Sequence, residues 1–200
     1  SGDQSTDTPT ANQCVLTPLW KGSGTLSQGN LKFNSSSNAY NWSISTIAIP
    51  TSGKWVCEFV KNTGTFAMIG VCQMGNHNAT SGQTYGYGYN IGTGEIINSG
   101  SVVVDDADND TIKFFDDGTE IFPASTGASN TVGLSGHDSL HFWAAPYASG
   151  TAVTSTFSNL SGTPSSGFKE LSAANLTTPT IKNPQKYFDT FAYLGNGKGQ

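Results

Sequence analysis

Aromatic residues of the kind that stack on sugar rings gather in one short stretch near the middle of the chain. Tyr85, Tyr87 and Tyr89 are separated by single glycines. Successive side chains of a β-strand point to opposite faces, so a strand here would carry all three rings on one face. Such a ladder could stack against sugar rings, or the rings could pack into a core while the glycine face admits another backbone. Trp42 and Trp143 leave the same two interpretations open.

Several carboxylates lie close together further along the chain, at Asp105, Asp106, Asp108 and Asp110. Alternate aspartates can supply the first ligands of a Ca²⁺ loop. That loop needs a glycine for its sharp turn, and Thr111 stands at this position. The sequence therefore favours a solvated turn. We expect neither a metal ion nor another cofactor.

A second polar group combines residue types that hydrolases and metal sites use. His137, Ser139 and His141 would share one face of a strand, with Asp138 beside them. The chain contains no G-x-S-x-G nucleophile elbow and no H-E-x-x-H zinc motif. We therefore expect surface or packing roles for these side chains and a protein that is not an enzyme.

The composition limits both the fold and the partners. Charged residues make up 12% of the 200 residues, about half the usual share, and 24 residues are glycine. All nine cationic residues are lysine, so the guanidinium fork that grips phosphates is missing. With a net charge of -5, nucleic acid is not an expected partner. Residues that favour strands outnumber good helix formers, which predicts an all-β fold.

Three cysteines, Cys14, Cys57 and Cys72, form an odd set without C-x-x-C spacing. This pattern indicates neither a disulfide framework nor a zinc knuckle, and it favours buried free thiols. No apolar run is long enough for a membrane span, so we expect no membrane insertion. The chain begins at Ser1 rather than methionine and shows no signal peptide, so we expect part of a longer protein.

Short apolar runs recur between clusters of glycine, serine and asparagine, as in an antiparallel two-sheet β-sandwich. Between two of these runs, the Asp117-Gly118 pair predicts a tight β-hairpin turn. The expected strands span residues 31–33, 44–49, 55–60, 66–72, 85–89, 102–104, 111–115, 120–122, 140–145 and 153–157.

The two ends differ from the sandwich, which we expect over residues 12–166. Residues 1–11 carry no large apolar side chain and predict a polar linker. Residues 167–200 contain Pro179 and Pro184, which exclude a long helix or a central strand. We expect this segment to be an extended arm that packs on the sandwich and leads to a further domain.

The middle of the chain resembles SPRY domains, which are concanavalin A-like jelly-roll sandwiches. Ser52 to Phe59, read S-G-K-W-V-C-E-F, is similar to their S-G-K-W-Y-x-E-V strand. Asp110 to Gly118, read D-T-I-K-F-F-D-D-G, resembles their D-x-T-I-x-F-Y-x-N-G hairpin, and Met68 to Val71 resembles their I-G-I strand.

The ends resemble the SPRY-like domains of tailed-bacteriophage structural proteins. Asp7 to Asn12 and Gly29 to Leu31 are similar to their D-T-P-T-N-N opening and G-N-L strand. Asn175 to Ile181 resembles their closing N-L-P-x-P-x-I stretch. Tyr187 to Asp189 and Tyr193 to Gly197 resemble the Y-F-D and Y-T-G-N-G motifs that follow it.

The resemblance implies a non-catalytic virion module of a tail fibre or capsid appendage that contacts host-surface glycans or a receptor. An alternative is a purely architectural module that binds neighbouring virion proteins. A third interpretation, a polysaccharide-degrading enzyme, needs two carboxylates facing one groove. Only Glu58 or Glu95 with a distant aspartate could supply them. Fibre relatives imply that the parent protein is a homotrimer.

Overall fold

The computed structural model describes residues 12–73, 86–93, 96–99, 113–116, 119–122, 139–161 and 167–176. Residues 1–11 and 102–104 and most of the predicted arm lie outside this part. The described elements are β1 (Leu16–Lys21), β2 (Gly24–Ser27), β3 (Lys32–Ser35), β4 (Ser43–Ser45), β5 (Lys54–Val56), β6 (Glu58–Thr63), β7 (Ala67–Gln73), β8 (Gly86–Asn90), β9 (Ile96–Ser99), β10 (Phe114–Asp116), β11 (Thr119–Phe122), β12 (Leu140–Pro146), β13 (Ala152–Thr156), β14 (Phe168–Glu170) and a 3-10 helix, η1 (Ala173–Asn175).

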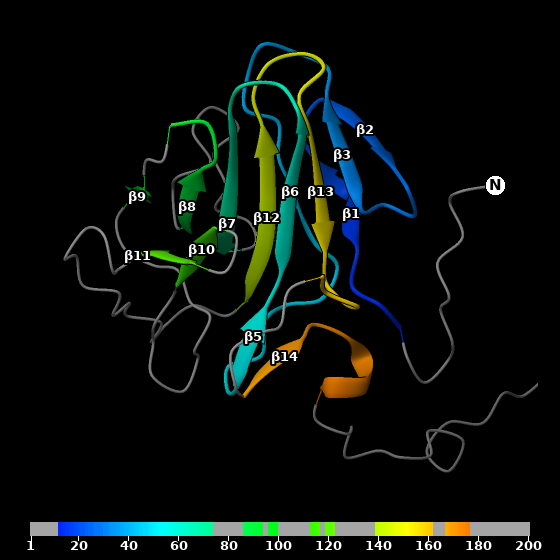
Figure 1. Cartoon of the computed structure of the whole chain (residues 1–200). Helices are drawn as coiled ribbons and strands as arrows, with labels where there is room; N and C mark the ends of the chain where they lie inside the picture. Colours follow the sequence, from blue (N-terminus) through cyan, green and yellow to red (C-terminus); the bar gives the residue numbers. More distant parts are fainter. Residues whose placement is uncertain are drawn as a thin grey trace, which may run out of the picture.

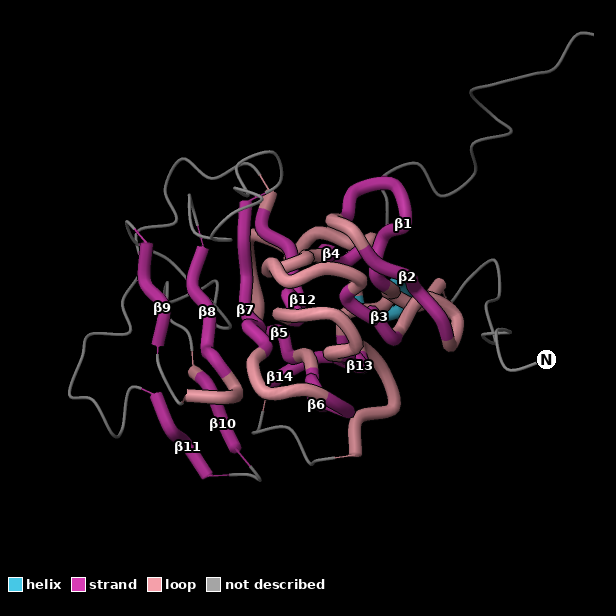
Figure 2. The backbone as a smooth tube through the Cα atoms, turned by 90° about the horizontal axis from the view of Figure 1, so that it is seen from above, coloured by secondary structure: helices cyan, strands magenta, loops and turns pink. Residues whose placement is uncertain are grey.

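Two main antiparallel sheets contain most of the described strands, as the sequence predicts for a β-sandwich (Figure 1). The larger sheet has the strand order β1-β4-β12-β7-β8-β9, and the smaller has the order β2-β3-β13-β6. Figure 2 shows the sheets as two layers, with β1 of the larger sheet beside β2 of the smaller one. We call the face of the larger sheet toward the smaller one its inner face and the opposite one its outer face.

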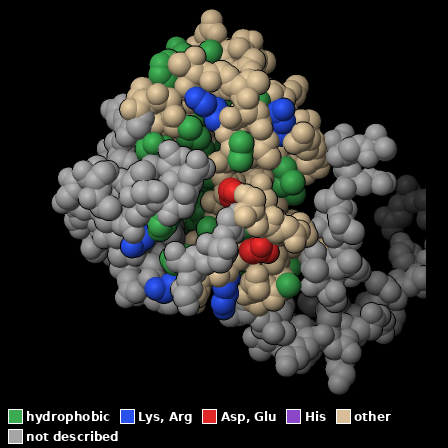
Figure 3. Space-filling view, in the orientation of Figure 1, with side chains coloured by type: hydrophobic (Ala, Val, Ile, Leu, Met, Phe, Trp, Pro, Cys, Tyr) green, Lys and Arg blue, Asp and Glu red, His purple; other side chains and the backbone are tan. Residues whose placement is uncertain are grey.

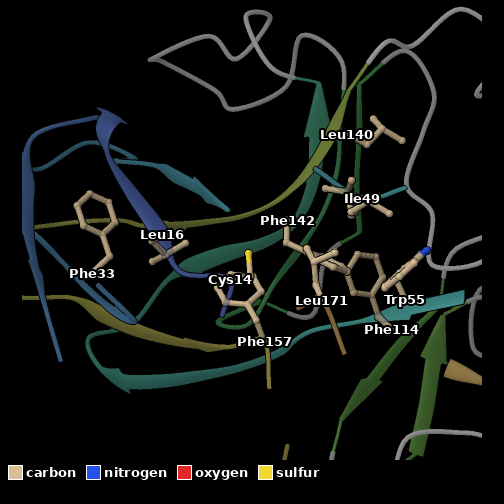
Figure 4. Packing of buried hydrophobic residues seen from close by; sticks show 11 residues of the cluster. Cys14, Leu16, Phe33, Ile49, Trp55, Phe114, Leu140, Phe142, Phe157 and Leu171 are labelled. Atoms are coloured by element: carbon tan, nitrogen blue, oxygen red, sulfur yellow. The ribbon is translucent and has the colours of Figure 1, made fainter. Parts of the chain in front are cut away.

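The main core fills the space between the two sheets (Figure 4). Phe33 lies in β3 of the smaller sheet, and Phe157 directly follows β13. Both pack in one cluster with Val71 and Phe142 from the inner face of the larger sheet. Phe33 and Phe157 are 0% and 1% exposed. Burial of one such ring stabilises the fold by roughly 1.5–3 kcal/mol, so this layer supplies much of the driving force for folding.

The predicted hairpin is present. β10 and β11 pair antiparallel, with Asp116 opposite Thr119, so a two-residue connection joins the strands. This connection is the Asp117-Gly118 pair, which itself lies outside the described residues. On β10, Phe114 joins the main core, whereas Phe115 is 45% exposed.

The start of the predicted arm pairs with both β5 and the beginning of the sandwich. β14 runs parallel to β5, and Leu171 directly after it is fully buried in the main core. Ser172 forms an isolated antiparallel bridge with Gln13, and the backbone N–H of Ala173 donates to the carbonyl of Asn12 at 3.0 Å. The described ends of the chain therefore lie side by side at the lower end of the molecule in Figure 1.

Reciprocal lysine-aromatic contacts reinforce the β5-β14 pair. Lys54 Nζ lies 5.7 Å from the ring centre of Phe168, and Lys169 Nζ lies 5.9 Å from the ring centre of Trp55. The Trp55 indole N–H donates to the carbonyl of Ser52 at 2.9 Å. At exposed sites each cation-π contact contributes about 0.5–1 kcal/mol, so the pair is held by side chains as well as by its backbone.

The predicted strand over residues 44–49 is shorter than expected. Only Ser43–Ser45 form β4, and Ile49 returns as an isolated bridge to Leu140. The predicted strand over residues 55–60 divides into β5 and β6. β1 also departs from regular pairing, because an irregularity separates its two paired residues, Leu16 and Lys21, and Leu19 between them is 95% exposed.

Candidate functional site

The tyrosine-glycine stretch forms the predicted strand, β8. Tyr85 lies outside the described residues, and of Tyr87 only the backbone is described, paired with Val71. Tyr89 is partly buried against the main core, with its ring centre 5.8 Å from that of Phe114. The one described ring of this ladder therefore takes part in core packing.

Trp42 and Trp143 are both buried, at 8% and 3% exposed. They belong to a second apolar cluster on the outer face of the larger sheet. Trp143 packs against Gly88 of β8, where an added Cβ would stand 3.1 Å from its Cζ2 atom. Burial of both rings fits the packing interpretation, and a part of either ring in ligand binding stays a prediction. The other buried members of the cluster are Ile44, Met68, Cys72 and Ala145.

Tyr40, Tyr147 and Phe66 form a row of aromatic rings at the upper end of this outer face. Tyr40 forms an isolated bridge with Tyr147, in the register that pairs β4 with β12. The backbone N–H of Tyr147 donates to the carbonyl of Phe66 at 3.0 Å. The ring centres of Tyr40 and Tyr147 are 4.7 Å apart, and those of Phe66 and Tyr147 are 6.4 Å apart with an edge-on angle of 67°. All three side chains are partly exposed, unlike Trp143 below them.

Three turns carry these rings: residues 36–41 between β3 and β4, residues 64–66 between β6 and β7, and residues 147–150 between β12 and β13. We call them the turn cluster; it lies at the upper end of Figure 1, away from the paired chain ends. The side-chain carbonyl of Asn38 accepts from the backbone N–H of Ser149 at 3.3 Å. The Thr63 hydroxyl donates to the carbonyl of Gly150 at 2.7 Å. Together with the bond from Tyr147 to Phe66, these bonds join the three turns to one another.

The turn cluster contains no charged side chain. Its residues other than the three rings are Ser, Asn, Ala, Gly and Thr. Lys61 reaches this cluster, where its ammonium donates to the carbonyl of Thr65 at 3.1 Å. On the face drawn in Figure 3, acidic atoms appear near mid-height and below it, whereas the charged atoms of the upper part are those of lysine. Ala148 has a φ of 68°, a left-handed conformation that is uncommon outside glycine and often marks functional turns.

His141 and Ser45 form the described contact closest to a hydrolase dyad. His141 Nδ1 lies 2.8 Å from the carbonyl of Ser45, so this nitrogen carries a hydrogen and donates. The Ser45 hydroxyl donates in turn to the carbonyl of Ile47 at 2.7 Å. Burial lowers the pKa of His141, which is 6% exposed. Because Nδ1 already carries a proton, it cannot accept one from this hydroxyl. Ser139 is partly exposed, and His137 lies outside the described residues.

Two described glutamates, Glu58 and Glu170, accept hydrogen bonds from the turn at residues 160–161. Glu58 accepts from the backbone N–H of Ser161 at 2.9 Å and from the hydroxyl of the same residue. Glu170 accepts from the backbone N–H of Leu160 at 3.3 Å. Two carboxylates thus stabilise residues 160–161. Glu95, the other glutamate considered for glycoside hydrolysis, lies outside the described residues.

The described residues contain no group of three or more His, Cys, Asp or Glu side chains that could hold a metal ion. Residues 105–110 lie outside this part, so the structure leaves the prediction of a solvated turn there untested. All three thiols are free. Burial raises the pKa of Cys14 and Cys57, and it raises the pKa of Cys72 to about 12. These thiols therefore stay protonated near neutral pH and are poor nucleophiles.

Sequence reasoning missed the row formed by Tyr40, Tyr147 and Phe66. The three residues are far apart in the chain and come together only through the register of β4, β12 and β7. The local signal was weak, because each ring stands singly beside a turn.

Comparison with known proteins adds no further constraint. No protein-family model matches the chain, and a search of curated proteins found no match. In the described part of the chain, no helix is long and apolar enough to cross a membrane.

Proposed function

We propose that the chain is a non-catalytic binding module of a bacteriophage structural protein, a tail fibre or a capsid appendage. In this proposal it is a SPRY-like, concanavalin A-like jelly roll that contacts glycans or another receptor on the host surface. The observation that carries the binding role is the row of partly exposed rings in the turn cluster. Aromatic surface beside a few placed polar groups is typical of ligand sites.

The arrangement of the two ends of the molecule supports this role. The described chain ends pair with each other at one end of the sandwich, and the turn cluster lies at the opposite end. A parent protein, proposed to be a homotrimer, could hold the module by the first end and present the second to the host. Turns positioned by a rigid scaffold are a common place for binding residues.

The virion setting rests on the sequence motifs of the phage SPRY-like domains. These motifs lie toward the two ends of the sequence, at Asp7 to Asn12, Gly29 to Leu31 and residues 175–197, whereas the motifs of β5, β6 and the β10-β11 hairpin resemble SPRY domains in general. The non-catalytic role is supported by the hydrogen bonds that engage His141, Ser45 and Glu58 in the structure.

The architectural alternative is favoured by a different surface. Leu19 projects from the irregular part of β1 with 95% of its surface exposed, and Val60 on the edge strand β6 is 48% exposed. Exposed apolar side chains at sheet edges suit contacts with neighbouring proteins. In this alternative the module joins virion proteins and binds no host component.

Binding to host material separates these functions. The labelled chain is incubated with a panel of bacterial cells and with an array of their surface polysaccharides. Retention by one class of cell or glycan supports the proposal. Absence of all retention, together with capture by other virion proteins of the same phage, would favour the architectural role. Release of reducing sugar from the retained polysaccharide would contradict the non-catalytic assignment.

A further inference from the structure

We propose that the row of Tyr40, Tyr147 and Phe66 is a stacking platform for an uncharged sugar ring, with Tyr147 as the central contact. The inference deepens the proposed function and rests on it. It places the ligand at the turn cluster, away from the tyrosine-glycine strand where the sequence first suggested sugar binding.

Tyr147 occupies the middle of the row. It has Tyr40 on one side at 4.7 Å and Phe66 on the other at 6.4 Å, measured between ring centres. Its neighbours are inclined to it by 49° and 67°, and all three side chains are partly exposed. A sugar ring presents C–H groups on one side, and the electron-rich face of an aromatic ring attracts such groups.

The platform is already formed in the unliganded protein. Backbone hydrogen bonds fix both edges of the row, from Tyr147 to Phe66 at 3.0 Å and from Asn41 to Pro146 at 3.1 Å. Below the row, Trp143 is 3% exposed and Tyr40 packs against its cluster. A ligand that binds here orders few additional side chains, which lowers the entropic cost of binding.

The surroundings select an uncharged ligand. Ser36, Asn38, Thr65 and Ser149 are exposed around the row, and their hydroxyl and amide groups can both donate to and accept from sugar hydroxyls. An acidic sugar would need an arginine or a free lysine for its carboxylate. The chain has no arginine, and Lys61 directs one of its three donors to the carbonyl of Thr65, so the surface beside the row offers no guanidinium fork for a carboxylate.

Substitution of the central ring tests the platform. The probes are neutral and acidic glycans of bacterial surface polysaccharides on one array, with affinities measured by titration calorimetry for those retained. Tyr147→Ala should weaken binding of the neutral glycan by up to about tenfold, since an aromatic contact contributes up to about 1.5 kcal/mol. Tyr147→Phe, which keeps the ring, should retain most of the affinity.

Two further variants keep the test interpretable. Phe115→Ala removes an exposed ring on β10 outside the turn cluster and should leave binding unchanged. Ser149→Trp adds bulk at an exposed position of the turn that carries Tyr147 and should block the platform even if Tyr147→Ala folds poorly. Unfolding midpoints of all variants verify that each is folded.

The outcomes distinguish the inference from the function on which it rests. If the unaltered chain binds a glycan and both Tyr147→Ala and Ser149→Trp bind it equally well, the platform is wrong and the function stands. Selective binding of acidic glycans would overturn the ligand class. If the unaltered chain binds no cell and no glycan, the proposed function itself fails.

Discussion

The indole of Trp143 lies against Gly88 so closely that a methyl group on Gly88 would stand 3.1 Å from Cζ2. The two residues come from β12 and β8, which are separated in the sheet by β7. At that level β7 also contributes a glycine, Gly70, which pairs with both residues. The glycine face of β8 thus makes room for a side chain from another strand, where the sequence suggested the approach of another backbone.

Gly88→Ala should destabilise the fold. The added methyl group meets both the Trp143 ring and the carbonyl of Ile69, at 3.1 and 3.3 Å, and overpacking of this kind costs about 1–3 kcal/mol. Urea unfolding of the single and double variants measures the effect. In a Trp143→Leu background the same alanine should cost clearly less. Equal costs in both backgrounds would mean that the indole is not the obstacle.

This contact illustrates what the sequence could predict. The β8 strand and the β10-β11 hairpin follow from local patterns, alternating tyrosine and glycine in one case and the Asp117-Gly118 pair in the other. The partner of Gly88 lies 55 residues downstream in Trp143, and no local pattern reveals such a pairing. For the same reason the row around Tyr147 could not be predicted.

The unpredicted strands have physical reasons too. β1 contains Pro18, and β2 begins at Gly24, residues that weaken a strand pattern. β14 is short and pairs parallel with β5, a strand far earlier in the chain. Their positions are decided by tertiary pairing more than by local preference.

Two glycines of the turn cluster allow two effects of an alanine substitution to be separated: strain of a left-handed backbone and a steric clash of the new Cβ with a neighbour. Gly64 and Gly150 have nearly the same positive φ, 86° and 84°. A Cβ on Gly64 would stand 2.7 Å from Cβ of Thr151, whereas one on Gly150 meets nothing within 4 Å. Gly150→Ala should therefore cost about 1–2 kcal/mol for the left-handed backbone alone.

Gly64→Ala should cost about 3 kcal/mol or more, because the buried Thr151 side chain must also move. Thermal unfolding of both variants provides the comparison. Equal losses of stability would show that collision with Thr151 contributes nothing.

Ser155 carries a buried hydroxyl without a hydrogen-bond partner, at 0% exposure in β13. Ser155→Ala should stabilise the protein by about 1 kcal/mol, because the unfolded state loses a hydrated hydroxyl while the folded state loses no bond. Ser43 is the matched control, since it is equally buried and its hydroxyl donates to the carbonyl of Thr17 at 3.1 Å.

Ser43→Ala should destabilise by about 0.5–1.5 kcal/mol. Denaturant midpoints measured under identical conditions give both differences. A loss of stability in Ser155→Ala as large as that in Ser43→Ala would contradict the assignment of an unpaired hydroxyl.

His141 should make stability depend on pH in the weakly acidic range. Burial lowers its folded-state pKa below the ordinary value of 6.5, so the unfolded chain binds a proton more readily than the folded protein. The contribution is favourable near neutral pH and is lost as the pH falls through 6.5 toward the folded-state pKa. In His141→Gln the amide can still donate to the carbonyl of Ser45 but cannot titrate. As the pH falls from 7.5 to 5.5, the unaltered protein should therefore lose more unfolding free energy than the variant does. This is the expected pH range for a histidine whose folded-state pKa is lowered. Parallel pH profiles would show that His141 does not change its protonation on unfolding.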